Sequence, residues 1–259
     1  MIISRAPFRI TLAGGGTDLP AFYEKHGSTF LSCAIDKHIY VGVRERPLEK
    51  NVRVQYLDSE EVDKVKDLKH NRARACLQLH GFEDSIEVIS SADLSARSGM
   101  GSSGSYIVAL LHALRTFKNL PIDPQTIANE ACHIEMNVLK EPAGKQDQFI
   151  AAYGGITRFK IDTIGNVTSQ KFSLDKDTSE RLQKNCMIFY TGVLRNASDV
   201  LSKQQSNIRK NDQSMLAIQQ IGFDSIDSLE RGDLDRFGKL MHEHWLQKKA
   251  TSNAITIDS

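Results

Sequence analysis

The sequence of 259 residues lacks the features that mark several protein classes. No two of its four cysteines form a C-x-x-C pair, so the spacings of zinc sites and thioredoxin-like sites are missing and we expect reduced thiols. It has no apolar run of about 18 residues, the length that a transmembrane helix needs. Its start lacks the basic and apolar regions of a signal peptide. We therefore expect a protein of the reducing cytoplasm that does not associate with membranes.

An excess of charge of one sign is also missing. The 33 Lys and Arg residues against 32 Asp and Glu residues leave a formal charge of +1, which gives no global field for holding nucleic acid or an anionic membrane. Apolar residues at 40% and charged residues at 25% are ordinary for a globular protein. The length allows one large domain or two modest ones. A small-molecule ligand is therefore a better expectation than nucleic acid.

Hydrophobic patterns predict a mixed fold. Residues 2–12 alternate in the manner of a half-buried strand that ends at Gly14–Gly16. Thr17 or Asp18 is expected to cap a short helix that ends at Gly27. Further strands are expected at 28–35, 39–45, 51–56, 85–89, 156–159, 167–172 and 186–190, and helices at 64–79, after 105, from 123 onward, at 198–220 and at 234–249. This pattern predicts an α+β fold with two-domain character.

The strongest single feature is the segment Gly99-Met-Gly-Ser-Ser-Gly-Ser, which precedes apolar residues at helical spacing. Glycines let backbone N–H groups approach a ligand, the following helix N-terminus attracts phosphate, and serine hydroxyls can bind phosphate or Mg²⁺. A Walker A loop is excluded because Ser105 stands where its lysine is required. A dinucleotide-binding loop is disfavoured because Gly99 lies too far beyond the predicted strand. A phosphate loop of another design, or a solvated loop before a core helix, remains.

Two carboxylates in the following segment are candidates for chemistry. Glu135 shares the helical register of an apolar stripe, so it either pairs with an arginine or a metal ion, or reaches solvent at the edge of the stripe. Asp147 lies in Pro142-Ala-Gly-Lys-Gln-Asp, a predicted loop, where it could act as a general base. Lys145 beside it could hold a phosphate. A polar surface turn is the alternative interpretation of this segment.

Other charged residues allow more than one interpretation. Arg5 and Arg9 share one face of the predicted first strand, which indicates either a nearby anion or a solvent-exposed face. Asp18 could bind ligand hydroxyls or only cap a helix. His242 and His244 do not face each other on a helix, so we expect surface or core histidines rather than a metal pair.

Several of these segments together resemble the GHMP small-molecule kinases in order and spacing. The sequence Ala-Pro-Phe-Arg-Ile-Thr-Leu, the glycine-serine loop and Glu135 to Asp147 are similar to the first two motifs and the catalytic segment of that family. Phe8, Met100 and Gly104 stand where the family motifs have glycine, leucine and alanine. Within the family, Gly-Gly-Gly-Thr-Asp-Leu-Pro and Gly-Lys-Gln-Asp-Gln most resemble the heptose kinases that phosphorylate C1 of D-glycero-D-manno-heptose 7-phosphate. L-Fucose kinase domains are similar too.

The resemblance implies a role for each matching residue. ATP phosphates would be bound by the loop residues Gly99, Gly101, Ser102, Ser103, Gly104 and Ser105. Mg²⁺ would be bound by Ser103 and Glu135. Asp147 would take the proton from the sugar hydroxyl, and Arg9 beside it would favour the developing alkoxide. The sugar would be bound by Gly16, Thr17, Asp18 and Lys145, with Lys145 or Arg195 as candidates for a substrate phosphate.

The resemblance also implies a two-domain fold. A ribosomal protein S5 domain 2-like N-terminal domain that binds ATP and sugar would span 1–160, and a ferredoxin-like C-terminal domain would lie at 161–259. The third family motif, K-x-x-G-A-G-G-G-G, has no counterpart after Gly192, so we expect an incomplete C-terminal domain whose effect on turnover needs a test.

These observations predict an ATP- and Mg²⁺-dependent sugar kinase that acts on a sugar or sugar phosphate, most similar to the heptose 7-phosphate enzymes. A fucose- or galactose-type kinase is one alternative. A non-catalytic nucleotide- or sugar-binding relative is another, because the third motif is missing. We expect a small-molecule substrate, no nucleic acid and no membrane partner, and a homodimer is compatible with the sequence.

Overall fold

The computed structural model describes residues 1–96, 98–189, 192 and 212–251. The chain divides into two compact units, one formed by Met1–Arg9 with Ala34–Gly154 and the other by Ile10–Cys33 with Gly155–Ser259. This division differs from the predicted boundary at residue 160 because residues 10–33 group with the second unit. Arg195 and the beginning of the helix predicted from residue 198 lie outside the described residues.

The first unit contains a sheet that is predicted in part by the sequence. Its strands are β1 (Ile2–Ala13), β2 (Ser28–Glu45), β3 (Val52–Gln55), β4 (Ser59–Val62) and β5 (Ile86–Ala92), of which β1 and β2 also run into the second unit. Strand β5 pairs antiparallel with β2 and parallel with β3, and β3 pairs antiparallel with β4. The separate strands predicted at 28–35 and 39–45 are one continuous strand, since residues 36–38 stay extended. Strand β4 was not predicted because its sequence, Ser-Glu-Glu-Val, has almost no apolar residues.

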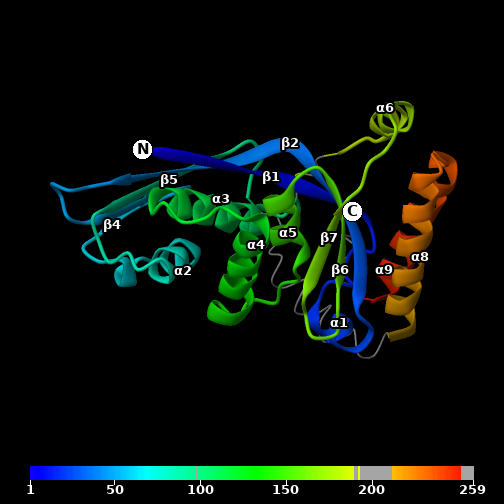
Figure 1. Cartoon of the computed structure of the whole chain (residues 1–259), viewed down its shortest axis with the longest axis horizontal. Helices are drawn as coiled ribbons and strands as arrows, with labels where there is room; N and C mark the ends of the chain where they lie inside the picture. The colour runs from blue at the N-terminus through cyan, green and yellow to red at the C-terminus, as the bar shows by residue number, and fades with distance from the viewer. Residues whose placement is uncertain (97, 190–191, 193–211, 252–259) are drawn as a thin grey trace. The chain divides into compact units, whose positions relative to one another are not determined.

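Helices cover one face of this sheet (Figure 1). They are η1 (Val65–Asp67), α2 (Asn71–Leu79), α3 (Ser102–Phe117), α4 (Pro124–Cys132), the π-helix η2 (His133–Val138) and α5 (Gln146–Tyr153). Helix α3 buries Ile107, Leu110 and Leu114 in a core shared with Val41 and Val88 of the strands. Such an apolar stripe at helical spacing is the pattern that predicted this helix.

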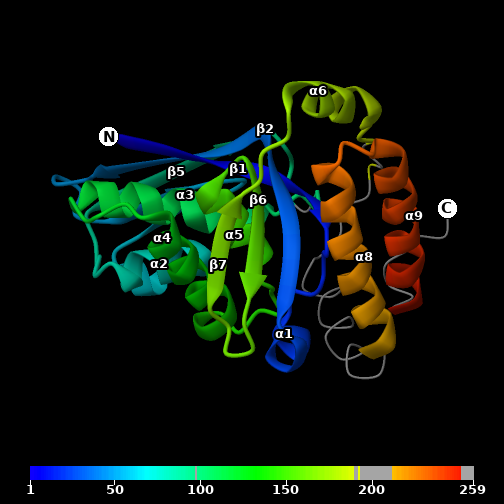
Figure 2. The same ribbon diagram turned by 45° about the vertical axis from the view of Figure 1, so that its right-hand side comes forward.

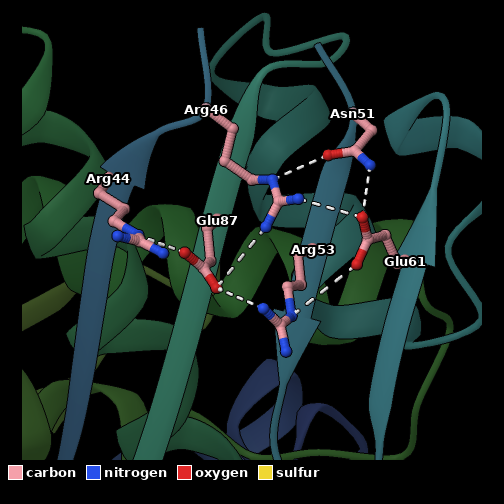
Figure 3. Close-up of polar contacts among 6 residues, drawn as sticks. All are labelled: Arg44, Arg46, Asn51, Arg53, Glu61 and Glu87. Atoms are coloured by element: carbon pink, nitrogen blue, oxygen red, sulfur yellow. Dashed lines mark hydrogen bonds and ion pairs between the residues drawn. The ribbon is translucent and has the colours of Figure 1, made fainter. Parts of the chain in front are cut away.

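The opposite face of the sheet carries a charged cluster (Figure 3). Its members are Arg44, Arg46, Asn51, Arg53, Glu61 and Glu87. The Glu87 side chain is 1% exposed, and Arg44 and Arg53 approach it from the two neighbouring strands. These residues lie opposite Glu87 in the strand register, so the pairs are direct cross-strand neighbours. The cluster therefore satisfies a buried carboxylate on the face without helices.

The second unit combines strands with helices. Helix α1 (Pro20–His26) precedes the first part of β2, which pairs with β6 (Ile156–Ile161), and β6 pairs with β7 (Val167–Lys171). Helix α6 (Lys176–Asn185) follows. Helices α8 (Asp212–Glu230) and α9 (Leu234–Thr251) lie side by side (Figure 2). No helix among the described residues combines the length and apolar character that crossing a bilayer requires.

Two predictions for the second unit are corrected by the structure. The residue before α1 is Leu19, and no described side chain caps this helix, so Thr17 and Asp18 are not its caps. Gly27 does end the helix, with φ of 65°, as predicted. The strand predicted at 186–190 is not formed by residues 186–189, which follow the unpredicted helix α6 in irregular conformation, while residue 190 lies outside the described residues.

Candidate active site

Arg9 and Asp147 form an ion pair next to the glycine loop. The Nε atom of Arg9 donates a hydrogen bond of 2.7 Å to Oδ1 of Asp147, and the two side chains are 17% and 28% exposed. Arg9 also donates from Nη1 to the Gly99 carbonyl at 2.9 Å and from its backbone N–H to the Met100 carbonyl at 3.1 Å. The structure thus brings together β1, the loop and α5 around one partly exposed carboxylate.

The glycine loop leads directly into α3. Gly101 precedes the helix in left-handed conformation, with φ of 78° and ψ of 27°, and none of the described side chains caps the helix. A Cβ atom on Gly101 would lie 3.2 Å from Arg9 Cγ and 3.2 Å from Asp147 Cγ, so glycine allows the loop to approach the ion pair. The first N–H groups of a helix lack intrahelical acceptors and attract anions. Ser102 and Ser103 are half-buried in this first turn.

Ser105 is placed differently from the prediction. Its side chain is fully buried, and its hydroxyl donates to the Pro7 carbonyl at 2.7 Å. Its backbone N–H donates to the Gly101 carbonyl at 3.0 Å. Because both donors already have acceptors within the fold, Ser105 holds the helix to β1 rather than offering a donor to phosphate.

Asp147 lies in a helix rather than in the predicted loop. The preceding π-helix η2 ends at Val138, and α5 begins at Gln146, with Lys145 at its N-terminal boundary. The helix forms because Phe149 and Ile150 are fully buried. Asp147 is therefore in the first helical turn, where a carboxylate is favoured by the helix dipole. Lys145 lies two residues earlier in the sequence and is half-buried.

Glu135 is buried in the π-helix η2, with 2% of the residue exposed. The carboxylate accepts hydrogen bonds from Gln148 Nε2 and from the Ser103 hydroxyl, and its Oε1 lies 3.6 Å from Arg72 Nε. Burial raises the pKa of Glu135, while the Arg72 guanidinium and the hydrogen bonds from Ser103 and Gln148 act in the opposite direction. Of the predicted alternatives, pairing with an arginine is confirmed and escape to solvent is wrong.

Sequence reasoning missed Arg72 and Gln148. Gln148 follows Asp147 directly in the sequence, and this position next to the candidate base was the one signal that could have indicated a role for Gln148 in the site. Arg72 carries no local signal, because it reaches Glu135 only through the packing of α2 against η2.

The residues present fit a Mg²⁺ ion. Ser103 and Glu135 are in contact and supply the hydroxyl and carboxylate oxygens that this hard cation prefers. Among the described residues there is no cluster of three or more His, Cys, Asp or Glu side chains. A metal ion here would therefore take its remaining ligands from water and nucleotide phosphates, which is usual for Mg²⁺.

The predicted sugar-binding residues of the first glycine segment belong to the second unit. Thr17 is fully buried, and its hydroxyl contacts the Gly14 carbonyl at 2.8 Å and Ser28 Oγ at 2.6 Å, so the Thr17 hydroxyl stabilises the loop itself. Asp18 is 7% exposed. Gly16 has a positive φ of 97°. A sugar contact by Gly16 or Asp18 stays a prediction.

His242 and His244 differ in environment. His242 is exposed, whereas His244 is partly buried on α9 and hydrogen-bonds to the backbone of Gly15. Burial, with a smaller contribution from the neighbouring Lys248, lowers the pKa of His244 to about 4, although the hydrogen bond to Gly15 acts in the opposite direction. Neither histidine belongs to a metal-binding cluster within the described part of the chain.

A family comparison agrees with this geometry. Residues 66–155, which contain the glycine loop, Glu135 and Asp147, match the model of the GHMP kinases N terminal domain. The chain contains a GHMP kinase N-terminal domain. The mixed α+β fold is that of GHMP kinases. A mevalonate kinase structure has the same fold, with a TM-score of 0.67 at 18% sequence identity, covering 97% of this chain and 80% of the other.

Proteins similar to this chain include several sugar kinases. A D-glycero-alpha-D-manno-heptose 7-phosphate kinase of Campylobacter jejuni is 24% identical, covering 99% of this chain and 80% of the relative. An L-fucokinase/L-fucose-1-P guanylyltransferase of Bacteroides fragilis is 23% identical, covering 96% of this chain and 30% of the relative. The structure of a D-glycero-D-manno-heptose 1-phosphate kinase from Bacteroides thetaiotaomicron has a TM-score of 0.78 at 22% identity, covering 96% and 79%. Family and relatives support a phosphotransferase with an alcohol group as acceptor.

Proposed function

We propose that this chain is an ATP-dependent sugar kinase that transfers the γ-phosphoryl group to the anomeric C1 hydroxyl of D-glycero-D-manno-heptose 7-phosphate. The observation that supports it best is the Arg9–Asp147 pair, with its 2.7 Å hydrogen bond, beside a glycine loop at the N-terminus of α3. A base next to a phosphate-binding helix end is the arrangement that phosphoryl transfer to a hydroxyl requires.

The chain's own residues divide the work of the transfer. Arg9 binds Oδ1 of Asp147, and Oδ2 is the oxygen that would accept the proton of the sugar hydroxyl. The backbone N–H groups at the start of α3 would hold the phosphates of ATP. Since phosphoryl transfer needs positioning and charge stabilisation more than covalent chemistry, these fixed groups would account for most of the catalysis.

Ser103 and Glu135 would hold Mg²⁺ at the end of the same loop. When bound, the ion would neutralise negative charge on the phosphates of ATP. The contact between the Ser103 hydroxyl and the Glu135 carboxylate supports this pair as ligands.

The heptose assignment is supported by relatives and by the first glycine segment. The two heptose kinase relatives are matched over almost the whole of this chain, and the proposed sugar contacts are Gly16, Asp18 and Lys145. A second phosphate on the substrate would be bound by Lys145. A fucose- or galactose-type kinase is the second candidate, because an L-fucokinase and a galactokinase of Pyrococcus furiosus are also similar, the latter at 27% identity over 59% of this chain. A relative that binds nucleotide or sugar without turnover is the third candidate.

Replacing Asp147 with Asn tests the role of the base. We expect the variant to lose at least about 100-fold in kcat, which is the usual contribution of a general base, while its affinity for ATP measured by calorimetry stays within a factor of two or so. The control is Asp84→Asn, which changes a partly exposed carboxylate that pairs with Lys64 outside the site, and its kcat should be unchanged. Full activity of the Asp147 variant would show that another group accepts the proton.

A further inference from the structure

We propose that Arg72 is a positioning residue that fixes Glu135 in the geometry needed to bind a divalent cation. This inference rests on the proposed function of the Ser103–Glu135 pair. Arg72 lies in the first turn of α2 and has no place among the motifs that define the site.

The guanidinium of Arg72 lies between two carboxylates. Its Nη2 donates a hydrogen bond to Glu141 Oε2, and its Nε lies 3.6 Å from Glu135 Oε1. The Nε atom is buried and makes no hydrogen bond within the described part of the chain. A separation of 3.6 Å is too long for a hydrogen bond. Arg72 therefore compensates the charge of Glu135 while leaving the lone pairs of Oε1 available.

A backbone hydrogen bond also joins Glu135 and Glu141, the two glutamates that Arg72 contacts. The Glu141 N–H donates to the Glu135 carbonyl at 2.9 Å, and the Leu139 N–H donates to the Ile134 carbonyl at 2.9 Å. The π-helical turn thus folds the chain back so that Glu141 lies near Glu135, and Arg72 links their side chains. Because π-helical turns are often found at functional sites and cost backbone stability, a link of this kind is expected to hold the turn in place.

Gln148 holds the other carboxylate oxygen. Its Nε2 donates to Oε2 of Glu135, and its own Oε1 is buried without a hydrogen-bond partner among the described residues. Glu135 is therefore held by Arg72 from α2, by Ser103 from α3 and by Gln148 from α5. Three separate elements thus orient one carboxylate, and one of these elements, α5, also carries Asp147. Arg72 is the member that supplies a positive charge.

The planar fork of arginine is what this position uses, so lysine is the informative replacement. Arg72→Lys keeps the charge but cannot contact both Glu135 and Glu141 in the same way. Arg115→Lys is the matched control. Arg115 also uses two nitrogen atoms, donating to the Pro121 carbonyl at 2.8 Å and to Glu130 at 2.5 Å, and it lies outside the site.

The experiment measures Mn²⁺ binding by electron paramagnetic resonance in the presence of ADP, for the wild type and both variants of the full chain. We expect Arg72→Lys to bind Mn²⁺ about tenfold more weakly, and Arg115→Lys to bind it like the wild type. ADP affinity in the presence of a chelator should be equal in all three. In turnover assays, raising the Mg²⁺ concentration should restore kcat of Arg72→Lys without changing the KM for the sugar, which a general loss of structure would not do.

Equal Mn²⁺ affinity of Arg72→Lys and the wild type would overturn the inference. If Arg72→Lys does not fold, Glu141→Gln takes its place, because it weakens the other contact of Arg72 and preserves the size of the side chain. Unchanged Mn²⁺ affinity of Glu141→Gln would also overturn the inference. A wild type that binds no Mn²⁺ with ADP would instead refute the proposed function, so the two failures are distinguishable.

Discussion

Gly104 offers a test of how closely the phosphate loop and the candidate base must approach. A Cβ atom on Gly104 would lie 2.9 Å from Asp147 Cβ and 3.2 Å from both the Asp147 carbonyl carbon and the Gln148 nitrogen. Gly104 lies in the first turn of α3 and has no positive φ, so close contact with α5 is the reason for glycine here. Gly104→Ala therefore moves Asp147 away from the loop.

The size of the effect follows from these distances. Carbon atoms prefer separations of about 3.5–4.0 Å, so the two helices must separate by roughly half an ångström or more. Overpacking costs about 1–3 kcal/mol, and the gain in helix propensity from Gly to Ala offsets about 1 kcal/mol of it. A displacement near 1 Å can lower a rate about 100-fold. We expect a kcat about 10- to 100-fold lower, with a free energy of unfolding lower by about 0–2 kcal/mol.

Gly238→Ala is the matched control for this substitution. Gly238 is exposed within α9. Apart from its chain neighbours and the backbone of its own helix, no atom of the described residues lies within 4 Å of the position of an added Cβ. This variant should be more stable by about 1 kcal/mol because alanine favours the helix, and its kcat should be unchanged. Steady-state kinetics and urea unfolding of both variants provide the comparison. Wild-type kcat in Gly104→Ala, together with a gain in stability like that of Gly238→Ala, would refute the close approach.

Two further predictions concern stability. Glu87→Gln should lower the free energy of unfolding by about 2–3 kcal/mol, because it leaves Arg46 and Arg53 without their buried carboxylate. The third partner, Arg44, is half-exposed and reduces the size of this loss. A loss below about 1 kcal/mol in urea unfolding, or a changed kcat, would contradict this prediction. His244 has a folded pKa of about 4, below its value of 6.5 in the unfolded chain, so the unfolded state takes up the proton first and stability is lost as the pH falls from about 6.5 towards 4. Between pH 7 and 5 this amounts to about 2 kcal/mol, and His244→Asn should abolish that part of the pH dependence; an identical pH profile in the variant would show that His244 does not titrate in this way.

Local patterns predicted the elements whose signals are complete within a short segment. The alternation in residues 2–12 predicted β1, and Asp123 does cap α4, where its carboxylate accepts the Thr126 N–H at 2.8 Å. The apolar stripe after the glycine loop predicted α3. Strand β4 was not predicted, because its stability depends on pairing with β3 and on ion pairs such as that of Glu61 with Arg53 opposite it. Neither of these is visible in the composition of the strand itself.

The candidate site was predicted only in part, because some of its contacts depend on tertiary packing. Arg9 and Asp147 were paired through the family resemblance, and the structure brings them together. Pairing of Glu135 with an arginine was one of the predicted alternatives. The identity of its partners was not predictable, because Arg72 and Gln148 reach Glu135 from other elements that only tertiary packing brings together. Asp147 was placed in a loop because Pro142 and Gly144 outweighed the short helical pattern that follows.

Product analysis distinguishes a sugar kinase from a protein that only binds its ligands. The full chain is incubated with ATP, Mg²⁺ and D-glycero-D-manno-heptose 7-phosphate, with L-fucose and D-galactose in parallel, and the products are followed by phosphorus NMR. We expect a new phosphate signal coupled to the anomeric proton of the heptose, and with Asp147→Asn this signal should form at least about 100-fold more slowly. Absence of ATP consumption with all three sugars, while ATP is still bound, would contradict the kinase and favour a binding protein.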